Sequence, residues 1–244
     1  MNVKENIDHN ESIISYREKA EQGDADAQCN LGCCYYDGKG VEQDFDEAVK
    51  WFRKSAEQGN TDAQFRLGHC YYNGNGVEQD DDEAVNLFRK SAEQGNAQAQ
   101  SLLGFIYEAG YIVKRDYNEA IHWYRKSAEQ GDADAQFSLG YCYYSSNGVS
   151  KNDGVSQNDN EAANLFRKSA EQGNAFAQYW LGHCYYFGNG VKRNYNEAAN
   201  WFRKSDEQGH TPAKALLAIV EEEANSSLWN PIKSLLKRIG IIRK

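Results

Sequence analysis

The sequence has little proline, little positive charge and no long apolar run. Its 244 residues include two prolines and one methionine. Because proline normally punctuates irregular connections, its scarcity favours a mostly helical fold. No stretch approaches the roughly 18 consecutive apolar residues of a membrane-spanning helix, and residues 1–12 lack the apolar core of a secretory signal. We therefore expect a cytoplasmic protein.

The charge balance narrows the classes of partner. Lys and Arg number 27 against 36 Asp and Glu, which gives a net charge of -9. Binding to nucleic acid depends on cations that neutralise phosphates, so this balance argues against a nucleic-acid partner. Hydrophobic residues make up 40% of the chain, which is enough to build a core and is more than disordered chains contain.

A four-residue segment recurs along the chain. Ala-Glu-Gln-Gly begins at Ala20, Ala56, Ala92, Ala128 and Ala170, and Asp-Glu-Gln-Gly begins at Asp206. Self-similarity at a fixed period of a few tens of residues indicates stacked units that cannot bury their apolar faces alone. We predict one solenoid over residues 1–223, with five full repeats and a half-repeat at each end. The full repeats are 24–59, 60–95, 96–131, 132–173 and 174–209, and the half-repeats are 8–22 and about 211–223.

Each repeat contains two helical patterns joined by a glycine turn. In the first repeat, Ala27, Leu31, Cys34 and Tyr35 share one face of a predicted helix over residues 24–36. Gly38 and Gly40 then mark the turn. At the junction between repeats, Asn60, Asn96, Asp132 and Asn174 directly follow a glycine and are expected to cap the first helix of the next repeat.

The second helix of each repeat begins at a predicted capping box. Asp44 stands three residues before Glu47, so the Asp side chain is expected to accept a backbone amide and the Glu side chain to reach back. The helix is then expected to bury Ala48, Trp51, Phe52 and Ser55. The same box recurs at Asp8/Glu11, Asp80/Glu83, Asp116/Glu119, Asn158/Glu161 and Asn194/Glu197.

The repeated pattern A-E-Q-G-(N/D)-x-x-A-Q-x-x-L-G-x-x-Y-Y-x-G-x-G-V-x-x-D-x-x-E-A-x-x-W-F-R-K-S resembles the Sel-one-like repeat family, a relative of the tetratricopeptide repeat. The resemblance covers residues 8–223. It implies an all-α, right-handed α-α superhelix of antiparallel helix pairs that acts as a non-enzymatic scaffold or adaptor. Repeat three departs from the pattern at Glu108 and Ile112, and the second change is expected to re-aim a turn. Repeat four has six extra residues around 145–158, which predict a longer loop.

Five positions of the first helix vary most between repeats, and they share one helical face. In repeat one they are Asp26, Cys29, Asn30, Cys33 and Asp37, and we call this set in all five repeats the variable stripe. By similarity to tetratricopeptide arrays, the stripe lines the concave surface. Aromatic and Arg side chains are common interface anchors, and the stripe becomes more aromatic toward the C-terminus. The predicted partner-binding residues are Phe65, Arg66, His69, Leu102, Phe105, Phe137, Tyr141, Phe176, Tyr179, Trp180, His183 and Phe187.

The hypothesis is a groove near residues 176–187 that holds a protein or peptide segment, with surrounding acids that favour a basic ligand. An equally open interpretation is that some of these aromatic residues fill the core between repeats. The resemblance also leaves a second function open, because some relatives have been credited with small-molecule binding or hydrolase-like activity.

The six cysteines form no recognisable disulfide or metal pattern. Cys34, Cys70, Cys142 and Cys184 occupy one position of their repeats, where repeat three has Ile106, so this position behaves as a small buried hydrophobe. Cys29 and Cys33 are one helical turn apart, but no CxxC pair or nearby His completes a metal site. We predict reduced thiols, no metal, no cofactor and no catalytic residues.

Residues 224–244 depart from the repeat and reverse its charge. The segment 225–244 holds five cations and no acid, so it carries +5; since the whole chain carries -9, the remainder carries -14. Asn230 and Pro231 are a helix start, and Ile232, Leu235, Leu236 and Ile239 then form an apolar stripe. We expect a basic amphipathic helix that caps the open edge of the last repeat. Two alternatives are binding to a membrane surface and docking in an acidic groove of its own chain or a neighbour, which would be self-association.

Overall fold

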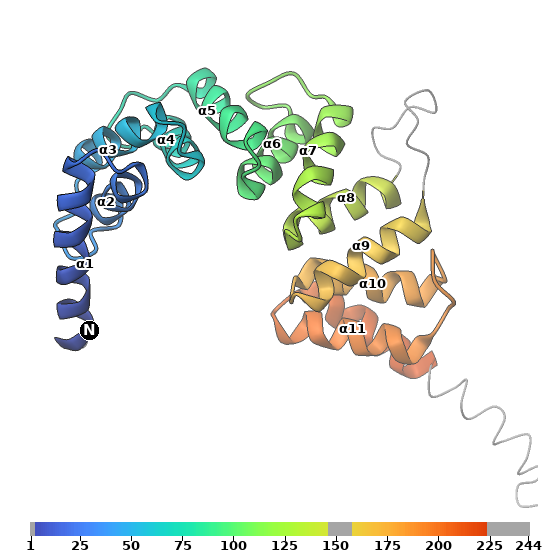
Figure 1. The fold of residues 1–244 in the computed structure, drawn as a ribbon. Helices are drawn as coiled ribbons and strands as arrows, with labels where there is room; N and C mark the ends of the chain where they lie inside the picture. Colours follow the sequence, from blue (N-terminus) through green and yellow to red (C-terminus); the bar gives the residue numbers. More distant parts are fainter. Residues whose placement is uncertain (1–2, 146–157, 224–244) are drawn as a thin grey trace, which may run out of the picture. The chain divides into compact units, whose positions relative to one another are not determined.

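A computed structural model describes residues 3–145 and 158–223 of the protein, and these ranges contain helices and turns but no strand (Figure 1). The prediction of an all-α solenoid of helix pairs is confirmed. Residues 211–223 are also helical. The labelled helices are α1 Val3–Glu21, α2 Ala25–Asp37, α3 Phe45–Glu57, α4 Thr61–Asn73, α5 Asp81–Glu93, α6 Ala97–Ala109, α7 Tyr117–Glu129, α8 Ala133–Ser145, α9 Asp159–Glu171, α10 Ala175–Phe187 and α11 Tyr195–Glu207.

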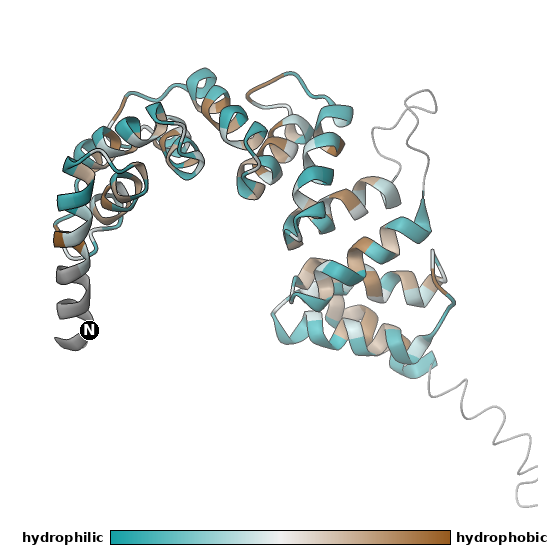
Figure 2. Ribbon diagram, in the orientation of Figure 1, coloured by the Kyte–Doolittle hydropathy of each residue, from teal (hydrophilic) through white to brown (hydrophobic). Residues whose placement is uncertain are grey.

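The chain divides into two compact units, residues 1–127 and 128–244. In the N-terminal unit, α1 packs on α2, and the pairs α2/α3 and α4/α5 follow, with α6 packed on α5. In the C-terminal unit, α8 pairs with α9 and α10 pairs with α11, while α9 and α10 join the two pairs. Figure 2 shows hydrophilic and hydrophobic residues interspersed along the coloured helices, as expected where one face of a helix is buried. Within the described ranges, no helix combines the length and the hydropathy that a membrane span requires.

The ends of the helices follow the predicted caps. The Asp24 carboxylate accepts from the Ala27 amide at 2.7 Å and begins α2, and Gly38 ends it in the left-handed region at φ +67°. Gly59 likewise adopts φ +88° between α3 and α4. Only glycine tolerates this conformation without a steric penalty, so the positions of these glycines determine where the helices end.

The capping boxes are only half as predicted. The Asp44 carboxylate accepts from the Glu47 amide at 3.0 Å, but the Asp44 amide donates to the Tyr35 carbonyl at 2.9 Å instead of to Glu47. The Glu47 carboxylate is used elsewhere, because it accepts from the Lys50 ammonium at 2.6 Å. A carbonyl of the preceding helix therefore replaces the Glu side chain, and the same bond recurs at Asp80, Asp116, Asn158 and Asn194. The box at Asp8/Glu11 does not mark a helix start, because α1 begins at Val3.

Within a repeat, the two helices meet at a glycine. A Cβ atom on Gly32 would lie 2.6 Å from the Phe52 ring, so only glycine lets α2 approach α3 this closely. Phe52 and Ala48 are fully buried there. The predicted buried face also included Trp51, but that side chain is only half-buried, and the Lys54 ammonium lies 4.1 Å from its ring centre. Cys34 and Tyr35 are likewise half-buried.

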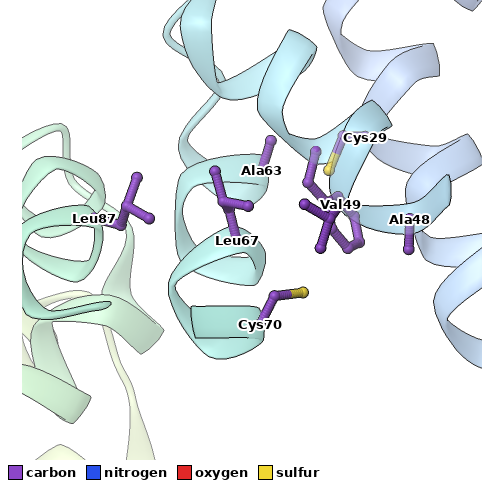
Figure 3. Packing of buried hydrophobic residues seen from close by; sticks show 8 residues of the cluster. Cys29, Ala48, Val49, Ala63, Leu67, Cys70 and Leu87 are labelled. Carbon is purple, nitrogen blue, oxygen red and sulfur yellow. The ribbon is translucent and has the colours of Figure 1, made fainter. Parts of the chain in front are cut away.

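The core continues from one repeat into the next. Figure 3 shows Val49, Ala63, Leu67 and Leu87, which come from consecutive helices of repeats one and two and form one buried cluster. Buried polar groups reinforce these contacts. The Ser55 hydroxyl donates to the Ala25 carbonyl at 2.6 Å, and the bond recurs at Ser91, Ser127, Ser169 and Ser205.

Two predictions lie outside the described residues. The role of residues 224–244 as a cap, a membrane-binding helix or a docking segment remains a prediction, and so does the structure of the loop at 146–157.

Candidate protein-binding surfaces

The variable stripe of the N-terminal unit surrounds His69. Phe65 and His69 of α4 meet edge to face with ring centres 4.6 Å apart, and both pack on the buried ring of Phe88. Burial and the nearby Arg66 guanidinium lower the pKa of His69, so its ring is neutral at pH 7. Leu102 of α6 is half-buried and Phe105 remains 56% exposed. The predicted residues of repeats two and three are therefore brought together on one surface.

Two pockets lie on either side of His69. A pocket of about 320 Å³ is lined in part by Phe65 and the exposed Arg66. A second pocket, of about 230 Å³, is lined almost entirely by apolar atoms. We call it the repeat-three pocket; its residues are His69, Tyr72, Phe88, Leu102, Phe105, Ile106, Ala109, Tyr111 and Ile112.

The variable stripe of the C-terminal unit is a continuous set of aromatic contacts centred on Trp180. The Trp180 ring lies 5.2 Å from Tyr141, 5.1 Å from Tyr144 and 5.3 Å from His183. Phe137 extends the set on one side, and Tyr179 packs on the core residue Phe202 on the other. The predicted residues of repeats four and five thus lie together as well.

Burial separates these aromatic residues into two groups. Tyr179 and Trp180 are half-buried and pack against the cores between helices, so they stabilise the fold as the second interpretation proposed. Phe176 and Phe187, at the two ends of α10, are 55% and 54% exposed. These two residues are the ones left open to a partner, and a test that mutates Tyr179 and Trp180 would confuse binding with stability.

Polar contacts within this surface are hydrogen bonds between His, Tyr and Asn. The Tyr144 hydroxyl lies 3.0 Å from His183 Nδ1 and accepts from the Asn189 amide at 2.9 Å. Burial lowers the pKa of His183 and raises that of Tyr144, which keeps both groups neutral at pH 7. In the described part of the chain, no group of three or more His, Cys, Asp or Glu side chains is placed to hold a metal ion.

Two cysteines belong to the stripe of repeat one. All six cysteines are free, and the Cys29 and Cys33 thiols are hydrogen-bonded. The bond from Cys29 lowers the pKa of Cys33, with a further contribution from the Arg66 guanidinium, whereas the pKa of Cys29 is raised. Burial raises the pKa of Cys70 and Cys184 to about 12. Cys33 is therefore the most nucleophilic of these four thiols.

Three residues of the repeat-three pocket were missed by the sequence analysis. Tyr72, Tyr111 and Ile112 lie outside the variable stripe, and the departure at Ile112 was interpreted only as a re-aimed turn. The available signal was a comparison of the turns: Asn75 and Asn189 precede glycine in repeats two and five, whereas Tyr111 precedes Ile112 in repeat three.

Comparisons with known proteins concern the repeat and the fold of the chain. The Sel1 repeat matches residues 25–60, 61–96, 97–132, 133–174 and 175–210. A protective antigen present in uropathogenic Escherichia coli strains, which displays an SLR fold, is 39% identical over 85% of this chain, with a TM-score of 0.78. This chain spans 43% of the length of that structure. A Sel1 repeat protein from Oxalobacter formigenes is 32% identical, over 84% of this chain and 86% of its own, with a TM-score of 0.71. A search of curated proteins finds no match.

Proposed function

Because the chain belongs to the Sel1 repeat family, we propose that it is a non-enzymatic scaffold that binds a protein partner along its variable stripe. The observation that carries this proposal is the exposure of large apolar side chains on the variable stripe. Among the described residues, Phe105, Phe176 and Phe187 of the stripe are each more than half exposed, and Tyr72 and Tyr111 line the repeat-three pocket together with Phe105. Large apolar side chains that stay exposed on the variable stripe indicate a protein-binding surface.

The chemistry of the stripe favours polypeptide over a small molecule. Aromatic side chains bury a large area at low entropic cost and are enriched among interface anchors. Pockets for drug-sized ligands typically measure about 300–1,000 Å³. The pocket beside Arg66, at about 320 Å³, lies at the lower end of that range, and the apolar repeat-three pocket, at about 230 Å³, falls below it. The repeat-three pocket accommodates one large side chain. We therefore rank small-molecule binding and hydrolase-like chemistry below protein binding.

The charge of the array favours a basic partner. Asp26, Asp62 and Asp134 begin the stripe in three repeats, and residues 1–224 carry a net charge of -14. Complementary charge mainly speeds association and selects between partners, while the aromatic anchors supply most of the affinity. The proposed ligand is a basic protein segment with large apolar side chains.

The experiment is affinity capture from the native cell, followed by titration of the captured protein. The test variant is Phe176→Ser with Phe187→Ser. The matched control is Ile14→Ser with Ile219→Ser, because these side chains are 59% and 47% exposed but lie outside the stripe. We expect the test variant to weaken binding at least tenfold and the control to leave it unchanged. Equal affinities for both variants would show that the partner binds elsewhere.

A further inference from the structure

Exposed aromatic side chains gather at the repeat-three pocket. Among the described residues, seven large hydrophobic side chains are exposed, and three of them, Tyr72, Phe105 and Tyr111, line this pocket. Tyr111 is 90% exposed, which is more than any of the other six. All residues of the pocket come from α4, α5, α6 and the turn after α6, within the N-terminal unit. One unit therefore carries both an apolar pocket and a protruding aromatic ring at its margin.

Tyr111 occupies a turn position that is polar in the other repeats whose turns the structure describes. Lys39, Asn75 and Asn189 stand there in repeats one, two and five. The Asn75 and Asn189 amides donate to tyrosine hydroxyls of the preceding repeat, at 3.0 Å and 2.9 Å. The Tyr111 ring lies in solvent instead, so the packing of the repeat does not account for an aromatic side chain at this position.

The pocket suits a tyrosine side chain. Its volume is about 230 Å³, and Phe88 and Ile106 are buried within it. His69 is half-buried and is the only lining residue, apart from the two tyrosines, whose side chain has a polar group. A buried tyrosine hydroxyl usually keeps a hydrogen-bond partner. Because the His69 ring is neutral, it can accept from the hydroxyl of an inserted tyrosine.

Charges of both signs lie close to the pocket, although no charged side chain lines it. The Arg115 guanidinium donates to the carbonyl of the lining residue Ala109 at 3.2 Å, and the exposed Lys114 precedes it. The Asp80 amide donates to the Tyr71 carbonyl at 3.0 Å, one residue before a lining tyrosine. Asp80 is the first of four consecutive acids. A patch of this kind presents a basic pair and an acidic run on either end of one apolar contact.

We propose that a second copy of this chain binds here, with the Tyr111 ring of each copy inserted into the repeat-three pocket of the other. A two-fold axis places the same patch on both copies, so a ring beside a pocket is complementary to itself. The same symmetry allows Lys114 and Arg115 of one copy to face the acids 80–83 of the other, and the reverse. These pairings offset the general repulsion between two acidic chains.

A foreign basic segment fits this patch less well than it fits the rest of the variable stripe. Lys114 and Arg115 would repel its cations beside the pocket, and like charges brought together at an interface suppress binding. A second copy brings charges of both signs and the aromatic ring together. The second copy is therefore the occupant that matches both the apolar and the charged parts of the patch.

The test is sedimentation-velocity ultracentrifugation of the full chain over a series of concentrations. The wild type is expected to form a dimer with a dissociation constant in the micromolar range. Tyr111→Ser should raise that constant at least tenfold, whereas Tyr111→Phe, which keeps the ring, should change it less than threefold. Phe187→Ser is the matched control, because it removes an exposed ring of the other unit, and it should leave the constant unchanged. The high exposure of Tyr111 means that its substitution should not alter the melting temperature.

Mixing two variants tests the insertion itself. Tyr111→Ser lacks the ring but keeps the pocket, whereas Leu102→Trp is designed to fill the pocket and keeps the ring. Each variant alone should be monomeric at concentrations where the wild type is a dimer. Their mixture should form a heterodimer that has one ring in one pocket. If Leu102→Trp lowers the melting temperature, Phe105→Ser, which removes a pocket wall, takes its place.

A wild-type chain that stays monomeric throughout the concentration series would overturn the proposal. So would a dissociation constant for Tyr111→Ser equal to that of the wild type, or a mixture of two folded variants that does not associate. The purified chain needs no captured partner in this assay. Dimer formation can therefore fail while partner capture succeeds, or the reverse, so the outcome is independent of the proposed scaffold function.

Discussion

The Tyr124 hydroxyl donates a 2.7 Å hydrogen bond to the Glu108 carboxylate, and both residues are exceptions to the repeat. In repeat one the corresponding residues are Tyr36 and Phe52, and the other three repeats also have tyrosine and phenylalanine there. Glu108 is half-buried and Tyr124 is buried. The Glu108 carboxylate therefore has a hydrogen-bond donor because repeat three has Tyr124 where the other repeats have phenylalanine.

This pair predicts strong coupling in a double-mutant cycle. Tyr124→Phe removes the donor and leaves the carboxylate partly desolvated, so the free energy of unfolding should fall by about 1–2 kcal/mol. Adding Glu108→Tyr restores the residues of the other repeats and should recover most of that loss. Urea denaturation of the two single variants and the double variant measures the coupling. Strictly additive effects would contradict the account.

The contact between Gly68 and Phe88 predicts a large cost for a single methyl group. A Cβ on Gly68 would lie 2.6 Å from the Phe88 ring, which is fully buried. Gly68→Ala should therefore lower the free energy of unfolding by about 1–3 kcal/mol through overpacking. Adding Phe88→Leu relieves the overlap and should make the alanine better tolerated than in the wild-type background. If urea denaturation gave Gly68→Ala the same free energy of unfolding as the wild type, α4 and α5 would not meet as described.

Three histidines predict a loss of stability in mild acid. Burial lowers the pKa of His69, His183 and His210, so the unfolded chain binds protons at a higher pH than the folded chain. Their contribution to stability is fully present above the unfolded pKa of about 6.5 and is lost as the pH falls through the folded pKa values. Melting temperatures should fall between pH 7.5 and 5.5. The fall in melting temperature should be smaller for His183→Gln than for the exposed control His122→Gln. Equal falls in the two variants would show that burial of His183 does not cause the loss of stability.

Cys33 is predicted to react first with a thiol reagent. Its pKa is lowered by the hydrogen bond from Cys29, whereas burial raises that of Cys70 and Cys184. Brief treatment of the folded chain with iodoacetamide at pH 7.5, followed by peptide mass spectrometry, should find most of the label on Cys33. Cys29→Ala removes the donor and should slow this labelling. Faster modification of Cys70 than of Cys33 would be the opposite result.

The sequence predicted the fold well because the repeat is determined locally. N-caps such as Asp24 and left-handed glycines such as Gly59 act within a few residues, so their spacing alone marks each helix. Only the Glu side of the capping box was wrong, and the reason is nonlocal, since the Asp44 amide donates to the Tyr35 carbonyl of the preceding helix.

The surfaces were harder to predict because one helix face serves two purposes. Tyr179 and Phe176 both belong to the variable stripe, but Tyr179 packs on the core and Phe176 remains exposed. The pocket was harder still. Its lining residues Tyr72, Tyr111 and Ile112 come from two repeats and lie outside the variable stripe.

The most direct test of the central claim, that the variable stripe binds a protein, is oxidative footprinting of the full chain with and without its captured partner. Hydroxyl radicals label exposed aromatic and aliphatic side chains, and mass spectrometry locates the label. The account predicts at least fivefold less labelling of Phe105, Phe176 or Phe187 in the complex, with Ile14 and Ile219 unchanged. Protection of Ile14 or Ile219, with all three phenylalanines labelled as before, would contradict it.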